Sequence, residues 1–208
     1  MKRLHKLNAW EASSLLACRE ITSEDLVRSC LDHIAEREPL IHAFAHLNPD
    51  AAIQQARALD AGAIRGALHG IPFGVKDLFD TADAPTAYGS AIYQGFQPLA
   101  DSAAVAHCRA AGGVMLGKTV TTELANMQPT AYVGSVQTEA VTTRNPHNYD
   151  HTPGGSSGGA AAAVGDQRAV DHFQPDRTGQ VRVALFHSYE SHDVLQTERP
   201  AGHRLDVS

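Results

Sequence analysis

The chain has 208 residues, of which 43% are hydrophobic and 19% charged, and its formal net charge at pH 7 is -6. This balance is typical of a globular protein and excludes the basic surface with which nucleic-acid-binding proteins meet phosphate. The three cysteines, Cys18, Cys30 and Cys108, lie far apart, which excludes a disulfide framework and predicts buried, reduced thiols. No apolar run approaches the length of a membrane span, and the first residues lack a signal-peptide core. We therefore expect a cytoplasmic enzyme or binding protein.

Helical patterns fill the first third of the chain. Residues 9–18 carry apolar side chains suited to a helix, and a second helical pattern begins at Thr22, whose hydroxyl can cap it. This second helix is predicted to stop at Pro39. A third, alanine-rich helix is predicted over residues 49–62. Because none of these segments carries a chemical motif, we interpret residues 1–65 as a helical cover over another part of the protein.

Strand patterns begin in the second third of the chain. The short apolar segment 68–78 predicts a buried strand, residues 102–111 predict a helix, and residues 114–117 predict the next strand. A strand, helix, strand order is typical of an α/β domain, so we assign residues 66–164 to an α/β core. The last segment, 165–208, is richer in charge and has no clear period. We expect it to be a loosely packed tail outside that core.

A glycine-rich loop surrounds two serines in the segment 151–164, which places four glycines around Ser156 and Ser157 and then runs into alanine. Glycines ahead of a helix allow close backbone approach and aim free N–H groups at whatever binds there. A phosphate loop is excluded because residues 154–159 lack the Lys-Ser/Thr pair of a P-loop, and the chain contains no GxGxxG motif. Two interpretations remain from these residues alone: a flexible loop that caps the following helix, or a frame that holds a serine hydroxyl for acyl transfer.

A lysine interrupts the apolar strand pattern at position 76. One interpretation is a strand-end lysine paired with the adjacent Asp77. The other is a buried lysine whose pKa falls far enough for the neutral amine to accept a proton. A serine hydroxyl is too weak an acid to attack an amide unaided, so a neutral lysine beside Ser156 would supply the base, as in serine–lysine variants of the catalytic triad. We therefore predict that Lys76 and Ser156 lie within hydrogen-bonding reach.

Five motifs follow one another along the chain. They are Gly-Ile-Pro-Phe-Gly-Val-Lys-Asp at 70–77, Thr-Ala-Tyr-Gly-Ser at 86–90, Gly-Lys-Thr at 117–119 with Glu-Leu at 123–124, Thr-Arg-Asn-Pro at 143–146, and Pro-Gly-Gly-Ser-Ser-Gly-Gly-Ala-Ala-Ala at 153–162. In order and approximate spacing, these motifs resemble the amidase signature family over roughly residues 1–164. The resemblance implies an α/β fold with a mixed β-sheet core wrapped by helices.

The resemblance also implies a function. Members of this family hydrolyse carboxylic amides, or transfer ammonia as one component of glutamyl-tRNA amidotransferase, by a Ser–cis-Ser–Lys mechanism. We therefore expect a small-molecule amide substrate, no cofactor, no direct nucleic-acid contact and no membrane. The expected partners are a second copy of the chain or amidotransferase-like subunits.

The motifs assign roles to individual residues by resemblance. Lys76 is expected to be the general base, and Ser156 the bridging serine, preceded by a cis peptide bond, that relays the proton. Ser157, Gly155 and Gly158 are expected to support them.

The attacking serine of the family is not found in this sequence. The resemblance places it about two dozen residues beyond Ser156, in a turn of the type Gly-Thr-Asp-Thr-Gly-Gly-Ser that also forms the oxyanion hole. Here the corresponding stretch is Asp-Arg-Thr-Gly-Gln at 176–180, and the nearby hydroxyls of Thr178 and Ser188 do not lie in a glycine turn. An abrupt end of the resemblance near Val164 favours a truncated or frame-shifted gene. The alternative function is therefore a catalytically silent remnant that serves as a binding or subunit-contact protein.

Other candidate chemistry is weaker. His147 and His151 flank a polar loop with Asp150, but no third ligand has metal-like spacing, so we predict no metal site. Glu123 is better explained as a glutamate in the first turn of a short helix than as a catalytic acid. Cys108 has no local support as a nucleophile and is predicted to lie in the core.

Overall fold

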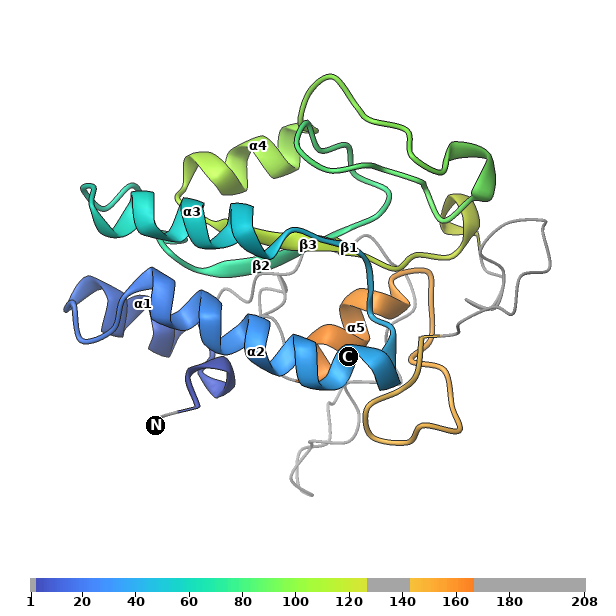
Figure 1. Ribbon diagram of the computed structural model, residues 1–208, viewed down its shortest axis with the longest axis horizontal. Coiled ribbons are helices and arrows are strands. Elements are labelled where there is room, and N and C mark those ends of the chain that lie inside the picture. Colours follow the sequence, from blue (N-terminus) through green and yellow to red (C-terminus); the bar gives the residue numbers. More distant parts are fainter. Residues whose placement is uncertain (1–2, 127–142, 167–208) are drawn as a thin grey trace, which may run out of the picture.

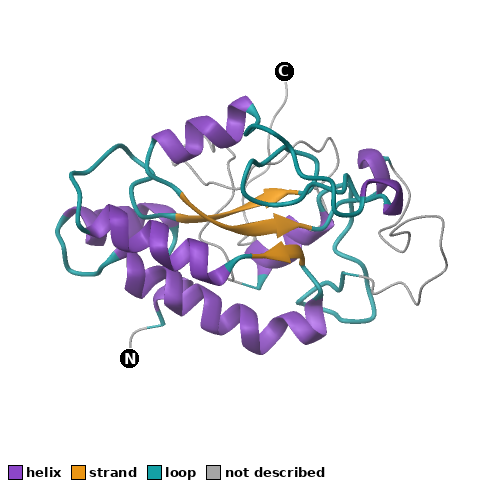
Figure 2. Cartoon of the chain, turned by 45° about the horizontal axis from the view of Figure 1, so that its top comes forward, coloured by secondary structure: helices purple, strands orange, loops and turns teal. Residues whose placement is uncertain are grey.

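A three-stranded mixed sheet forms the centre of the fold (Figure 2). The computed structural model describes residues 3–126 and 143–166. Its strands are β1 (Phe44–Leu47), β2 (Pro72–Lys76) and β3 (Val114–Thr119), in the spatial order β1-β3-β2. β2 runs parallel to β3, whereas β1 pairs with β3 in the antiparallel direction. The α/β fold with a mixed sheet is therefore confirmed, and both strands predicted from the sequence are present.

Three helices and a short 3-10 turn cover one face of the sheet. They are η1 (Leu4–Lys6), α1 (Ala9–Ala17), α2 (Ser23–Ile41) and α3 (Pro49–Asp60). Their apolar stripes pack with Ile71, Val114 and Leu116 into the largest core cluster. Figure 1 shows α1 and α2 on this side of the sheet. The helices form a cover, as predicted, because burial of one apolar stripe per helix stabilises an amphipathic segment that is marginal alone.

The opposite face carries α4 (Ala103–Ala110), which connects β2 to β3 (Figure 1). Val105 of α4 packs against Phe73, Val75 and Met115 in a second, smaller cluster. The loop between β2 and α4 crosses the same side and includes the short turn η2 (Ala91–Tyr93). The two faces of the parallel pair are thus covered by different segments, as is typical of α/β proteins.

The helix starts follow their capping residues. The Asn8 side chain and the Glu11 side chain form a reciprocal capping box at α1, and Thr22 accepts a hydrogen bond from the Asp25 N–H at α2. Asn48 caps α3 in the same way, with Pro49 at the first helical position. Ser102 occupies the cap position of α4 as predicted, but its side chain makes no capping hydrogen bond.

Three expectations need correction. α2 does not stop at Pro39 but continues to Ile41 and ends at His42, which adopts a left-handed conformation. Burial of the completely inaccessible Ile41 side chain outweighs one hydrogen bond lost at the proline. β1 was not predicted, and it lies inside the segment interpreted as a purely helical cover. Cys18 is exposed beyond the end of α1, whereas Cys30 is buried and Cys108 partly buried.

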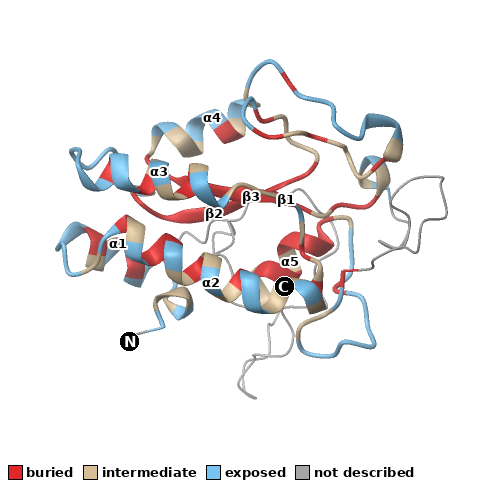
Figure 3. Cartoon of the chain, viewed as in Figure 1, coloured by how far each residue is buried: buried red, intermediate tan, exposed pale blue. Residues whose placement is uncertain are grey.

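A final helix, α5 (Gly158–Gly165), follows the glycine–serine loop and lies against the sheet and the end of α2. Its alanines Ala162 and Ala163 pack with Ile41 and Ala43. Figure 3 shows that the strands and much of α5 are buried, whereas the outer faces of α1 to α4 are exposed. The atypical tail predicted for 165–208 falls almost entirely outside the described residues. Within those residues, no helix is long and apolar enough to cross a membrane.

Candidate active site

Lys76 is the last residue of β2 and is completely buried. Pro72, Gly74 and Lys76 alternate with Phe73 and Val75, so the lysine faces away from the α4 cluster and toward α5. Burial lowers its pKa from 10.5 to about 8, since desolvation disfavours the ammonium form. A substantial fraction of the amine is therefore neutral near physiological pH.

Ser156 meets Lys76 across the end of the sheet. Its Oγ lies 2.7 Å from the Lys76 Nζ, a short hydrogen bond between residues 80 positions apart. The prediction that the two residues lie within hydrogen-bonding reach is confirmed. The peptide bond between Gly155 and Ser156 is cis, as the resemblance implied.

The turn after β3 anchors the Ser156 backbone. The Thr122 N–H donates to the Ser156 carbonyl at 3.1 Å, and the Thr121 hydroxyl donates to the same oxygen at 3.0 Å. Because β2 and β3 are parallel, Lys76 and this turn both lie at the carboxyl edge of the pair, where α/β proteins commonly bind ligands. The site is thus built from the ends of two strands and the start of α5.

Close backbone packing explains the glycine at position 159. A side chain on Gly159 would collide with the carbonyl oxygen of Ala43 and the amide nitrogen of Val120. The Gly159 N–H also donates to the Val120 carbonyl at 3.0 Å. α5 therefore enters against β1 and β3 at a distance that only glycine permits, and Gly158, its buried first residue, begins there. The helix-capping and serine-holding interpretations of this loop both describe part of what the structure contains.

Two buried hydroxyls near the site have no hydrogen-bond partner in the described part of the chain. These are Ser157 Oγ and Thr119 Oγ1. Thr119 pairs in register with Lys76 on the neighbouring strand. The supporting hydrogen bond expected of Ser157 is therefore not formed within residues 3–126 and 143–166, and its supporting role, like that of Gly155, stays a prediction.

Asp77 pairs with Lys118, a residue to which the sequence analysis assigned no role. The Lys118 Nζ lies 3.0 Å from the Asp77 Oδ1, and the Lys118 side chain is completely buried. The interpretation of Lys76 as a lysine paired with Asp77 is thus countered by an aspartate engaged with another strand. The Gly-Lys-Thr motif at 117–119 was a signal for this lysine, but local sequence could not reveal its distant partner.

The remaining candidates show no arrangement suited to catalysis. Among the described residues, no group of three or more His, Cys, Asp or Glu side chains is placed to hold a metal ion. Glu123 begins the short turn η3 (Glu123–Ala125) and accepts a hydrogen bond from the Ser90 hydroxyl at 2.7 Å. Cys108 packs beside the α4 cluster, where burial raises its pKa. The expected attacking segment 176–180 and the hydroxyls of Thr178 and Ser188 lie outside the described residues.

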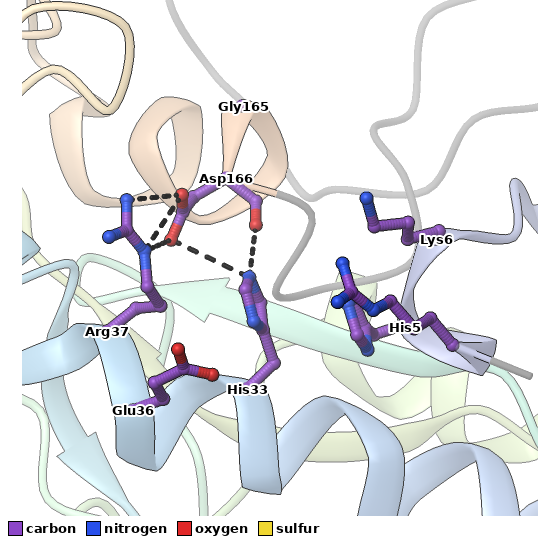
Figure 4. Close-up of a pocket in the computed structure, with 8 residues that line it drawn as sticks. His5, Lys6, His33, Glu36, Arg37, Gly165 and Asp166 are labelled. Atoms are coloured by element: carbon purple, nitrogen blue, oxygen red, sulfur yellow. Dashed lines mark hydrogen bonds and ion pairs between the residues drawn. The ribbon is translucent and has the colours of Figure 1, made fainter. Parts of the chain in front are cut away.

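A polar pocket of about 380 Å³ lies at the far end of α5 from Ser156 (Figure 4). Arg37 of α2 forms a two-pronged ion pair with Asp166, with 3.1 Å between Nη2 and Oδ1. The His33 ring bonds to the Asp166 carbonyl at 2.8 Å and stacks on His5 with 4.3 Å between ring centroids. Figure 4 shows these side chains converging from α2, η1 and the end of α5. The contacts attach the carboxyl end of α5 to the helical cover and do not reach Lys76.

Comparison with known proteins reveals similarity along most of the chain. The model of the amidase family matches residues 25–170. The A-type component of glutamyl-tRNA(Gln) amidotransferase from Acidothermus cellulolyticus is 40% identical over 187 residues, which cover 88% of this chain and 36% of that protein. The crystal structure of the native peptide amidase from Stenotrophomonas maltophilia superposes with a TM-score of 0.70 at 35% identity, covering 79% of this chain and 35% of that one. Fatty acid amide hydrolase, at 23% identity and a TM-score of 0.73 over 80% of this chain and 29% of its own, shares the fold.

The extent of these matches bears on the domain boundary. The chain spans little more than a third of the length of the curated relatives it matches. A match over 88% of this chain is longer than residues 1–164, so the resemblance continues past Val164, where the sequence analysis placed its end. The family model likewise extends to residue 170.

Proposed function

The chain belongs to the amidase signature family, and we propose that Lys76 and Ser156 form the proton-transfer pair of a site that cleaves carboxylic amide C–N bonds. The observation that carries the proposal is the 2.7 Å contact between a completely buried lysine amine and a serine hydroxyl. Either residue alone has an ordinary structural explanation. Their meeting at the carboxyl edge of the parallel strands is the arrangement that a serine–lysine hydrolase requires.

The chemistry begins with the neutral Lys76 amine. Its lone pair accepts the Ser156 hydroxyl proton, while Ser156 accepts a proton from the attacking hydroxyl, which bonds to the amide carbon. Collapse of the tetrahedral intermediate breaks the C–N bond, and the proton held on Lys76 returns through Ser156 to the leaving nitrogen. Water then cleaves the acyl ester by the same relay. A pKa near 8 suits this role because the group must both take and give a proton near neutral pH.

The relatives define the chemical class of substrate. The names of the matched proteins describe a peptide amidase and one component of a glutamyl-tRNA(Gln) amidotransferase. Both names concern an amide bond, so we propose a carboxylic amide as substrate and no cofactor. Amidotransferase-like subunits, or a second copy of the chain, are the proposed partners.

A second candidate follows from the residues beyond the site. Where the resemblance places a Gly-Gly-Ser turn, this chain reads Thr-Gly-Gln at 178–180. A chain that keeps the relay but lacks the attacking serine binds amides without turning them over. This observation favours a catalytically silent relative that serves as a binding or subunit-contact protein.

Hydrolysis of small aliphatic and aryl amides tests the two candidates. We expect the wild-type chain to release ammonia or amine at a rate no higher than that of Lys76→Ala and Ser156→Ala, because loss of an attacking serine costs about 10⁶-fold in serine hydrolases. Turnover that either substitution abolishes would establish the amidase and show that another hydroxyl, such as that of Thr178 or Ser188, attacks.

A fluorophosphonate probe separates the remaining cases. Labelling of the wild-type chain, reduced in Lys76→Ala, locates the attacking residue by peptide mapping. Amide binding by calorimetry without turnover supports the silent relative. Absence of labelling, binding and turnover together would refute both functions.

A further inference from the structure

Asp77 and Lys118 form a buried ion pair on the face of the sheet opposite to Lys76. Both side chains are almost or completely inaccessible, and 3.0 Å separates the lysine Nζ from the Asp77 Oδ1. Side chains alternate along a strand, so Asp77 follows Val75 toward α4, whereas Lys76 points toward Ser156. The pair is therefore not in contact with the proton-transfer site through either side chain.

The ion pair holds the segment 85–89 of the loop after β2. Lys118 Nζ donates to the Thr86 hydroxyl at 2.6 Å and to the Pro85 carbonyl at 3.3 Å. Asp77 accepts a hydrogen bond from the Ala87 N–H at 3.1 Å and another from the Gly89 N–H. Burial raises the pKa of Asp77 and lowers that of Lys118, and the attraction between the two charges offsets part of both shifts.

This loop lies directly on the turn that follows β3. Gly89 has a φ of +68°, and a side chain there would lie 2.7 Å from the carbonyl oxygens of Thr121 and Thr122. The Leu124 N–H donates to the Tyr88 carbonyl at 2.8 Å. The same turn makes the two hydrogen bonds to the Ser156 carbonyl, from the Thr122 N–H and the Thr121 hydroxyl. A continuous set of contacts thus links the ion pair to Ser156 without passing through Lys76.

We propose that Asp77 and Lys118 are positioning residues, which hold the 85–89 loop against the 121–122 turn and thereby place Ser156 over Lys76. This inference rests on the proposed function, in which the position of the Ser156 hydroxyl matters for proton transfer. Removal of one partner leaves a buried charge without compensation, which draws water or a rearrangement into the loop. A displacement of about 1 Å in a reacting group can cost about 10²-fold in rate.

Amide hydrogen exchange followed by NMR tests the positioning role in the absence of substrate. In Asp77→Asn we expect exchange at the Ala87, Thr122 and Leu124 amides to accelerate by about tenfold or more relative to Ala12 in α1, which reports overall stability. In the double variant Asp77→Asn/Lys118→Met, which leaves no lone charge, we expect the rates at Thr122 and Leu124 to return toward wild type. Glu24→Gln breaks an exposed ion network on α2 and is the matched control, with no change at Thr122.

A second readout excludes a role in stability alone. If Ser156 is displaced, Lys76 gains solvent, so its pKa, followed by NMR of labelled lysine, rises from about 8 toward its ordinary value in Asp77→Asn. Should that variant not fold, Thr86→Val removes the hydroxyl that accepts from Lys118 without changing a charge, and the same acceleration is expected at Leu124. Faster exchange confined to Ala87, with Thr122, Leu124 and the Lys76 pKa unchanged, would overturn the positioning role. Because no measurement here uses substrate, an inactive wild-type chain bears on the proposed function alone.

Discussion

The Lys76 amine and the Ser156 hydroxyl meet across the carboxyl end of the parallel strand pair, with 2.7 Å between Nζ and Oγ. The contact joins the end of β2 to the loop before α5, two segments 80 residues apart. Its consequences for titration and stability can be measured separately from turnover.

Lys76 should make the stability of the protein rise with pH. Its pKa of about 8 in the folded state lies below the ordinary 10.5, so between these values the unfolded chain binds more protons than the folded one. The cost of the buried ammonium is complete below pH 8 and disappears as the pH rises through this window. Urea unfolding at pH 7 and pH 10 should show that Lys76→Met loses about 2 kcal/mol of this pH-dependent gain, after allowance for solvent screening. Lys6→Met serves as a surface-charge control, and a Lys76→Met effect that is the same at both pH values would contradict the prediction.

Gly159→Ala should prevent the close approach of α5 to the sheet. The new methyl group would meet backbone atoms of Ala43 and Val120, which cannot move as freely as a side chain. We expect a loss of about 3 kcal/mol in the free energy of unfolding, measured by urea denaturation. Gly62→Ala is the matched control, because its nearest neighbour is 3.4 Å away and its effect should stay within about 1 kcal/mol. Equal effects of the two substitutions would refute the close-approach explanation.

The Arg37–Asp166 ion pair should stabilise the carboxyl end of α5. The guanidinium bonds both carboxylate oxygens, and these hydrogen bonds raise the pKa of Arg37. A double-mutant cycle with Arg37→Gln and Asp166→Asn should give a coupling free energy of about 1 kcal/mol, as expected for a partly buried bidentate pair. The exposed pair of Arg57 with Glu24 should give a smaller coupling. A cycle with no coupling at low salt would show that the pair does not hold the helix end.

The three thiols should react at widely different rates. Cys18 is exposed, whereas burial raises the pKa of Cys30 to about 12 and also raises that of Cys108. Because the thiolate is the reactive form, an aromatic disulfide reagent at pH 8 should label Cys18 at least about 100-fold faster than Cys30. Cys18→Ser should remove the fast phase, and labelling of Cys30 should require denaturant. A fast phase that persists in Cys18→Ser would place another thiol at the surface.

Much of the candidate site was predictable because its signals are local. A lysine in an apolar strand and two serines among glycines are each unusual within a few residues, and chemistry supplies a reason for them to meet. The order of strands and helices likewise follows from short periodic patterns, which is why β2, β3 and α4 were expected close to where they lie.

Other features depend on burial that no local pattern reveals. β1 has only four residues, and its hydrogen bonds come from β3, about 70 positions away. Pro39 stays inside α2 because Ile41 fills a pocket against α5, a gain that outweighs the local preference to stop. Both outcomes depend on contacts between segments far apart in the chain.

By itself, the sequence determined the family, the α/β class and the pairing of Lys76 with Ser156, because these rest on residue types in unusual local settings. Only the tertiary structure decided that Lys118 takes Asp77 as its partner, and that the two hold a loop against the turn that anchors Ser156. The physical reason is that a buried charge must find its counter-charge in space, and the fold, not the adjacent sequence, determines which groups lie within reach.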